Sequence, residues 1–213
     1  MFNFYNSSVG KKFVIAASGI LLAFFLVFHL LGNLTLFGGE EVFNGYVKSL
    51  KNLKFLVRIA EFGLTIILLT HIVNAAIISY RNNKANPHSY LVNKADTNST
   101  FFSRNMGLSG TIVLTFLILH LQTFWFRFQN DGNLSYYEIV TGNEVGFARP
   151  EISIFYIIGI VLLAFHLKHG FQSAIKSLGL PIKNNVISGV GILFWLIIPA
   201  GFISIPLYFG FIK

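Results

Sequence analysis

Five long apolar stretches, separated by shorter polar segments, constrain the fold of this chain more than any other feature. They run from about residue 13 to 37, 58 to 80, 107 to 128, 152 to 175 and 186 to 211. Each can cross the roughly 30 Å hydrocarbon layer as a helix of about 20 residues. Unpaired backbone groups are costly in lipid, so helices are the expected spanning form. The stretches predict an all-α fold, a five-transmembrane-helix bundle in which residues 1–213 form a single integral membrane domain.

The composition agrees with a membrane protein and excludes several kinds of site. Of the 213 residues, 54% are hydrophobic and 11% are charged, and none is cysteine. Disulfides, thiolate zinc sites and cysteine-ligated iron–sulfur clusters are therefore excluded on this chain. The formal net charge of +8 comes from lysines and arginines that lie mostly between the apolar stretches. We therefore expect contact with membrane lipids and no binding of nucleic acid.

The polar segments predict the topology. Residues 38–57, 81–106, 129–151 and 176–185 carry the glycine, asparagine, proline and charge that are typical of connections. More lysines and arginines lie on the side of the N-terminus, so the chain is expected to be a multi-pass protein of the cell inner membrane with a cytoplasmic N-terminus. The first stretch follows Lys11 and Lys12 as a signal peptide would, but it is about twice as long as a signal h-region. We expect an uncleaved first span.

Four of the six histidines fall one per span in the first four spans, namely His29, His71, His120 and His166. An imidazole in hydrocarbon is costly without a partner, so four of them favour a ligand role over packing. Successive spans run in opposite directions, and each residue rises about 1.5 Å. His29 and His120 should therefore lie somewhat outside the midplane, and His71 and His166 somewhat inside it. The spacing predicts an outer pair and an inner pair, stacked along the membrane normal.

Two bis-histidine haems fit this arrangement, with each pair supplying the axial ligands of one iron. Neutral imidazole binds haem iron at both axial positions, and such six-coordinate iron passes single electrons without an open site for substrate. Helices that approach a flat porphyrin need small residues near the ligand. Gly159 and Gly170 lie on the helical face of His166, and Gly110 lies about three turns before His120. The predicted cofactors are two haems b.

The other two histidines, His169 and His88, are not the preferred haem ligands. His169 is the alternative inner ligand, but it lies closer to the helix end, so His166 is preferred. His88 falls in a polar run and is expected to be a solvated loop residue. The residues that could hold haem propionates are His169, Lys168, Arg81 and Arg127.

Several runs around these histidines together resemble one family. They are Ser18-Gly19-Ile20-Leu21-Leu22 before Phe28-His29-Leu30-Leu31-Gly32-Asn33-Leu34, then Leu69-Thr70-His71, Leu119-His120-Leu121 and Phe165-His166-Leu167-Lys168-His169-Gly170. The chain resembles the di-haem cytochrome b subunit of succinate dehydrogenase and fumarate reductase, in the five-helix, single-anchor form found in Bacteroidetes. The resemblance spans nearly the whole chain.

The resemblance implies a membrane anchor for a flavoprotein subunit and an iron–sulfur subunit. That complex interconverts succinate and fumarate while electrons pass through the haems to or from menaquinone, and the dicarboxylate site is not on this chain. By position, His71 and His166 match the ligands of the haem nearer the iron–sulfur subunit. His29 and His120 match those of the distal haem. The direction of electron flow and the formation of a dimer of such heterotrimers stay open.

Quinone exchange is expected near the distal haem, where a carboxylate within proton-transfer reach would help. Glu61, inside the outer end of the second span, is the best candidate. The alternative for Glu61 is a salt bridge with Arg58 at the start of that helix. Asn33 and Trp125 are weaker candidates for the quinone site on the same side.

Two other functions compete with this prediction. The first is a di-haem cytochrome that serves a hydrogenase, a formate dehydrogenase or an ascorbate-linked reductase. The second is a proton or cation transporter without haem, which should show intramembrane acids or broken helices. Glu61 is the main intramembrane acid, and Pro199 is a candidate kink in the fifth span.

Overall fold

The computed structural model describes residues 7–85, 106–181 and 184–213. Within these residues, five helical segments are long and apolar enough to cross a membrane, as the apolar stretches predict. The first four are several residues longer than their apolar stretches, and the fifth is longer by one residue. The segments are α2 (Ser8–Leu34) with η1 (Thr35–Gly38), α4 (Lys54–Ala85), α7 (Met106–His120) with η2 (Leu121–Trp125) and α8 (Phe126–Asn130), α10 (Pro150–Ser177), and α11 (Asn185–Ile192) with η3 (Leu193–Ile197) and α12 (Ile198–Phe211). His88 lies outside the described residues.

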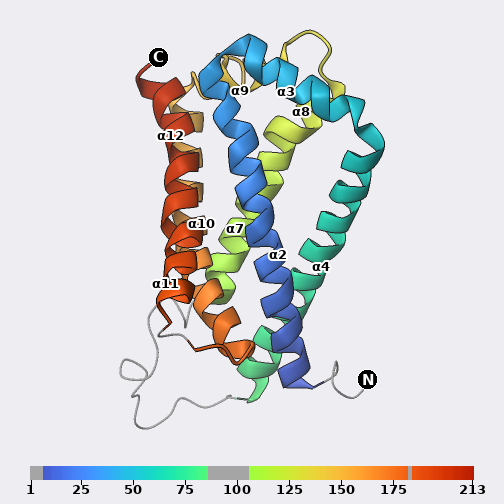
Figure 1. Cartoon of the computed structure of the whole chain (residues 1–213), viewed down its shortest axis with the longest axis vertical. Helices are drawn as coiled ribbons and strands as arrows, with labels where there is room; N and C mark the ends of the chain where they lie inside the picture. Colours follow the sequence, from blue (N-terminus) through green and yellow to red (C-terminus); the bar gives the residue numbers. More distant parts are fainter. Residues whose placement is uncertain (1–6, 86–105, 182–183) are drawn as a thin grey trace.

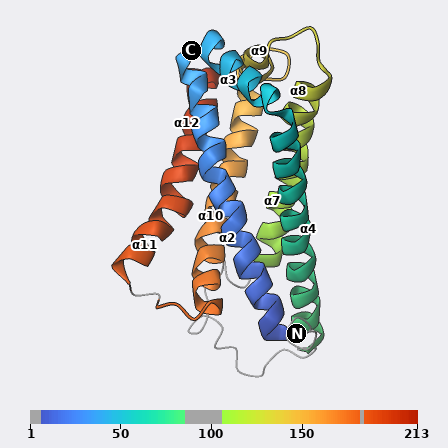
Figure 2. The ribbon, with the colours of Figure 1, turned by 45° about the vertical axis from the view of Figure 1, so that its right-hand side comes forward.

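The first and fourth spans form the centre of the bundle. Helix α2 packs against α4, α10 and α12, and α10 packs in addition against α7 (Figure 1). Figure 2 shows α4 beside α7, on the opposite side of α2 from α12. The described N-terminal residues lie at one end of the bundle, and the C-terminus lies at the other (Figure 1). We call these the N-terminal end and, after the helix that crosses it, the α3 end.

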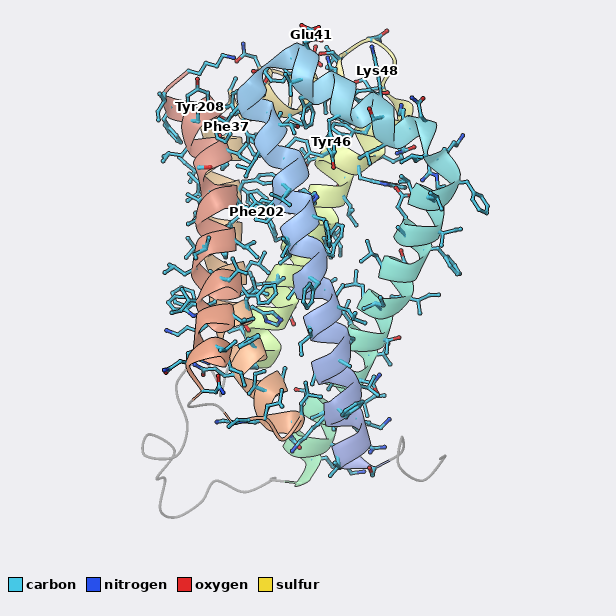
Figure 3. All side chains as sticks on the ribbon, viewed as in Figure 1. Phe37, Glu41, Tyr46, Lys48, Phe202 and Tyr208 are labelled. Atoms are coloured by element: carbon cyan, nitrogen blue, oxygen red, sulfur yellow. The ribbon has the colours of Figure 1, made fainter. Side chains whose placement is uncertain are left out.

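Helix α3 (Glu40–Asn52) shows that residues 38–57 are more than a connection. It begins after Gly39, whose φ of +88° favours glycine, and Glu40 and Glu41 lie in its first turn, where acids suit the helix dipole. Phe43 and Val47, one turn apart, are buried against the bundle. The helix therefore lies across the end of the bundle with its polar face outward (Figure 3).

Helix α9 (Tyr136–Thr141) completes this cap. The Ser135 side chain accepts from the Glu138 backbone N–H, and the Glu138 side chain accepts from the Ser135 N–H, which forms a capping box. The C-terminal Lys213 Nζ donates to the Tyr137 hydroxyl at 2.9 Å. The buried core of the cap joins α3 and α9 to the first and fifth spans and to the segment before α10, through Leu36, Phe43, Val47, Ile139, Val140, Phe147, Ile205 and Phe209.

Two spans contain a π-helical turn. One, Leu121–Trp125, begins directly after His120, and the other, Leu193–Ile197, ends two residues before Pro199. Proline has no backbone N–H and crowds the preceding turn, which accounts for the irregular turn before Pro199. Turns of this kind inside helices are frequent at functional sites, and the one beside His120 lies next to a candidate ligand.

Candidate functional site

His29 of α2 and His120 of α7 lie together, towards the α3 end of the bundle. Their ring centroids are 5.8 Å apart, and the ring planes are nearly perpendicular at 86°. The two residues are far apart in sequence but at similar depth, because the first and third spans run in the same direction. The structure thus brings together the two histidines that were predicted to form the outer pair.

Aromatic side chains surround this pair. Their ring centroids lie between 5.3 and 6.2 Å from those of the imidazoles. They are Phe25 and Phe202 beside His29, and Phe116, Phe124 and Tyr156 beside His120. In Figure 3, Phe202 lies between α12 and α2. The pair is therefore held by ring packing from four of the five spans.

Two polar groups accompany the rings. The Asn33 side-chain amide donates to the His29 carbonyl at 2.7 Å and lies 3.4 Å from His29 Nδ1. Asn33 was a candidate for the quinone site, and in the structure its side chain is hydrogen-bonded to the His29 backbone. Tyr156 is 4% exposed, and its hydroxyl lies near the Thr123 side chain but has no hydrogen-bond partner of good geometry among the described residues. An unpaired buried hydroxyl next to His120 marks a place where a bound group could supply the missing partner.

His71 of α4 and His166 of α10 lie further towards the N-terminal end, near enough for a charge on one ring to affect the other. Each ring is held by the helix beside it. His71 Nδ1 lies 3.1 Å from the Ser18 hydroxyl and 3.1 Å from the Ile15 carbonyl, both of α2. His166 Nδ1 lies 3.4 Å from the Ser109 hydroxyl of α7. Hydrogen bonds rather than ring stacks fix these two imidazoles.

Glycines allow the close approach of helices at both histidines of this pair. A Cβ on Gly19 would lie 3.1 Å from His71 Cε1, and one on Gly110 would lie 3.7 Å from His166 Cε1. Gly110 thus lies beside His166 rather than beside His120, the neighbour that the sequence predicts. Gly110 lies ten residues before His120, about 15 Å along the helix, so its depth is that of His166.

The glycines expected on the His166 face have different surroundings. A Cβ on Gly159 would collide with the Phe116 ring at 2.3 Å, so this glycine makes room for a side chain that stacks on His120. A Cβ on Gly170 would meet no described atom within 4 Å.

Glu61 lies at the α3 end in a network that links α4 to the third span. Arg58 Nη1 donates to Glu61 Oε2 at 2.6 Å, and Trp125 Nε1 donates to Glu61 Oε1 at 3.0 Å. Arg58 Nη2 also donates to Gln129 Oε1 at 2.7 Å. The salt bridge that was the alternative for Glu61 is therefore present. The network also joins Glu61 to Trp125, two residues predicted separately for the quinone site.

The predicted propionate partners are dispersed. Arg127 pairs with Asp131 at 3.8 Å near the α3 end. Lys168 Nζ lies 4.4 Å from the ring centroid of Trp195 and so faces the fifth span. Arg81 is exposed on the last turns of α4, and His169 is partly exposed three residues after His166.

A cavity of about 680 Å³ opens at the α3 end, beside the π-helical turn that follows His120. Six of its ten lining residues are polar or charged, although most of the lining surface is apolar, and sequence reasoning identified only Arg127 among these residues. The polar run at Gln122 and Thr123, inside an otherwise apolar span, was the available signal. The cavity is lined by Gln122, Thr123, Phe126, Arg127, Asn130, Asp131, Gly132, Asn133, Val145 and Ile152.

The number of ligand atoms limits which groups each histidine pair can bind. Among the described residues, histidine, cysteine, aspartate and glutamate form no group of three or more that could bind a metal ion. Each histidine pair offers two nitrogen donors, so a metal there would need the rest of its ligands from a cofactor. Comparison with protein-family models, curated proteins and solved structures finds no match for this chain.

Proposed function

We propose that this chain is a membrane cytochrome b that binds two haems, one through His29 and His120 and the other through His71 and His166. The observation that carries the proposal is that four spans contribute one histidine each and that these form two pairs at different depths. A pair of imidazoles with no third protein ligand suits an iron whose other four ligands come from a porphyrin.

The geometry of the first pair supports this assignment. The ring centroids of His29 and His120 are 5.8 Å apart, so the two imidazoles are close enough that one metal-bearing cofactor could be held by both. The flat aromatic side chains around the pair also suit a flat cofactor.

Haem iron with two imidazole ligands exchanges one electron and leaves no site for substrate. The contribution of the chain is to hold the ligands, exclude water with apolar helices and place the two pairs one after the other along the bundle. The arrangement supports a path for electrons between the N-terminal end and the α3 end.

The partners follow from the resemblance in the histidine runs. We assign the chain to the anchor of a succinate:quinone oxidoreductase, bound to an iron–sulfur subunit and a flavoprotein subunit, with menaquinone as its exchangeable substrate. Quinone reduction takes up two protons, so a quinone at the α3 end would need a nearby proton donor. Glu61 with Trp125 and the cavity beside Arg127 are the two candidate positions.

Haem quantitation tests the first part. The detergent-solubilised complex should contain two b-type haems per chain, measured by the pyridine haemochrome and the reduced-minus-oxidised spectrum. His29→Ala and His71→Ala should each lose at least one haem. His88→Ala is the matched control, because it removes a histidine that the sequence assigns to a polar connection and should retain both haems. A folded, membrane-inserted protein without haem, made in cells with adequate haem supply, would overturn the proposal in favour of a transporter.

Quinone reactivity and partners are tested separately. Flavin and iron–sulfur signals should co-purify with the chain, and their absence beside intact haem would point to another di-haem cytochrome. Glu61→Gln and Gln122→Leu should differ in their effect on menaquinone reduction by the reduced haems, with haem content unchanged. The variant that slows this step identifies the quinone position, and no effect in either variant would contradict both candidates.

A further inference from the structure

We infer that two Ser–Gly dipeptides, Ser18-Gly19 of α2 and Ser109-Gly110 of α7, are positioning residues for the histidines that face them. Each serine holds Nδ1 of its histidine protonated and leaves Nε2 bare, and each glycine lets the ring approach. The tautomer follows from the contacts alone, while its consequence for a bound haem rests on the proposed function.

The contacts of His71 determine where its proton lies. The Ile15 carbonyl, 3.1 Å from His71 Nδ1, can only accept a hydrogen bond. The Ser18 hydroxyl lies 2.7 Å from the Val14 carbonyl and 3.1 Å from the Ile15 carbonyl, so its single hydrogen is used within α2. Its oxygen is therefore also an acceptor for His71 Nδ1. Two acceptors face one ring nitrogen, and that nitrogen must carry the hydrogen.

His166 has the same arrangement on another helix. The Ser109 hydroxyl donates to the Met106 carbonyl at 3.0 Å, which leaves its oxygen to accept from His166 Nδ1 at 3.4 Å. The hydroxyl of each serine donates a hydrogen bond to a backbone carbonyl three or four residues earlier in its own helix. The same local geometry thus occurs twice, once for each histidine of this pair.

The following glycine completes each contact. With a Cβ at Gly19, the nearest His71 ring atom would be only 3.1 Å away, tighter than ordinary packing. At Gly110 the corresponding distance to His166 is 3.7 Å, ordinary contact. Both rings therefore present Cε1 to a glycine and Nδ1 to the serine before it.

Orientation of this kind matters because ligating histidines use one nitrogen for the metal and the other for a partner that sets the tautomer and basicity. His71 and His166 would each bind through Nε2. The partners are a carbonyl and hydroxyls rather than carboxylates, so the imidazoles stay neutral. His71 has two acceptors and His166 has one among the described contacts, and loss of the serine should therefore affect His166 more.

Nitrogen-15 NMR of the selectively histidine-labelled, full-length protein in detergent tests the tautomers without haem. The expected result is an Nδ1–H tautomer at both His71 and His166. Ser109→Ala should give a mixture of tautomers at His166, and Ser18→Ala a smaller change at His71. Ser188→Ala is the matched control, because this serine precedes Gly189 in α11 but is exposed. An Nε2–H tautomer in the wild type, or serine variants indistinguishable from the control, would overturn the inference.

The haem-loaded complex supplies the second readout. Removing an acceptor from Nδ1–H makes the ligand a weaker donor to ferric iron, so the midpoint potential of one haem should rise in Ser109→Ala. A tenfold change in the equilibrium corresponds to about 59 mV for one electron. Ser109→Thr, which keeps a hydroxyl, should restore the wild-type potential, and failure of this rescue would count against the inference. The correct tautomers in a protein that binds no haem would refute the proposed function and leave the positioning contacts intact.

Discussion

The two histidine pairs are built by different means. His29 and His120 are surrounded by aromatic rings, whereas His71 and His166 are tied by hydrogen bonds to serines on neighbouring helices. The first pair depends on packing, which is sensitive to volume. The second depends on directed polar contacts, which are sensitive to single atoms. One bundle thus orients its four histidine side chains in two ways. The two pairs should therefore respond differently to mutations around them.

The two histidine pairs also lie at different places along the bundle. The His29–His120 pair lies beneath the cap formed by α3 and α9, close to the cavity at Gln122 and to the Glu61 network. The His71–His166 pair lies nearer the N-terminal end, where α2 and α7 supply the serines. The two ends of the bundle therefore give the two histidine pairs different surroundings.

The largest expected effect comes from double variants that test which histidines share a haem. His29→Ala combined with His120→Ala should lose no more haem than either single variant, because both residues serve one site. His29→Ala combined with His71→Ala should lose both haems. Haem per chain, measured by the pyridine haemochrome, checks this. If the first combination abolished all haem while the protein stayed folded, the assignment of the pairs would be wrong.

The next effect concerns the aromatic packing around His120. Gly159→Ala would place a methyl group against the Phe116 ring, which packs on Phe155, Tyr156 and His120. Overpacking of this kind costs about 1–3 kcal/mol. The midpoint of thermal unfolding in detergent should fall. The signals of the haem at His71 and His166 should be affected less than those of the other haem.

Gly170→Ala is the matched control for this change. It lies in the same helix, and its added methyl group meets no described atom within 4 Å. Alanine is the better helix former by about 1 kcal/mol, so this variant should be neutral or slightly more stable. Equal destabilisation by both variants would mean that loss of glycine, and not the Phe116 contact, is responsible.

Sequence reasoning reached the pairing of His29 with His120 because depth depends only on residue number, direction and a constant rise. It missed α3, since a short amphipathic helix has the mean composition of a polar connection, and only the spacing of Phe43 and Val47 reveals it. It also missed the contacts of Ser18 and Ser109. Those depend on how far each helix rotates about its axis, which is decided by packing among all five spans.

A smaller effect is expected from the unpaired hydroxyl beside His120. Tyr156→Phe removes a buried hydroxyl that has no hydrogen-bond partner of good geometry among the described residues, and an unsatisfied group of this kind costs about 1–3 kcal/mol. The haem-free variant should therefore be more stable than the haem-free wild type by roughly 1 kcal/mol, measured by chemical unfolding. A loss of stability would show that the hydroxyl has a partner within the protein.

The smallest effect should come from Tyr46. This α3 residue packs over Gly32 of α2, about one turn after His29. Its hydroxyl lies where a Cβ on Gly32 would be, and Figure 3 shows it on the bundle side of α3. Burial raises the pKa of Tyr46 above its usual value of 10. A raised pKa in the folded state means that its contribution to stability is complete below pH 10 and is lost as the pH rises through the folded pKa.

Alkaline pH should therefore loosen α3 over the His29–His120 pair before it affects the His71–His166 pair. Phenolate absorbance followed between pH 9 and 12, together with the spectra of the two haems, measures both events. Tyr46→Phe should abolish the selective change near His29, because it removes the titrating hydroxyl and keeps the ring against Gly32. A change of equal size at both haems, or one that persists in Tyr46→Phe, would show that the cap does not distinguish the two pairs.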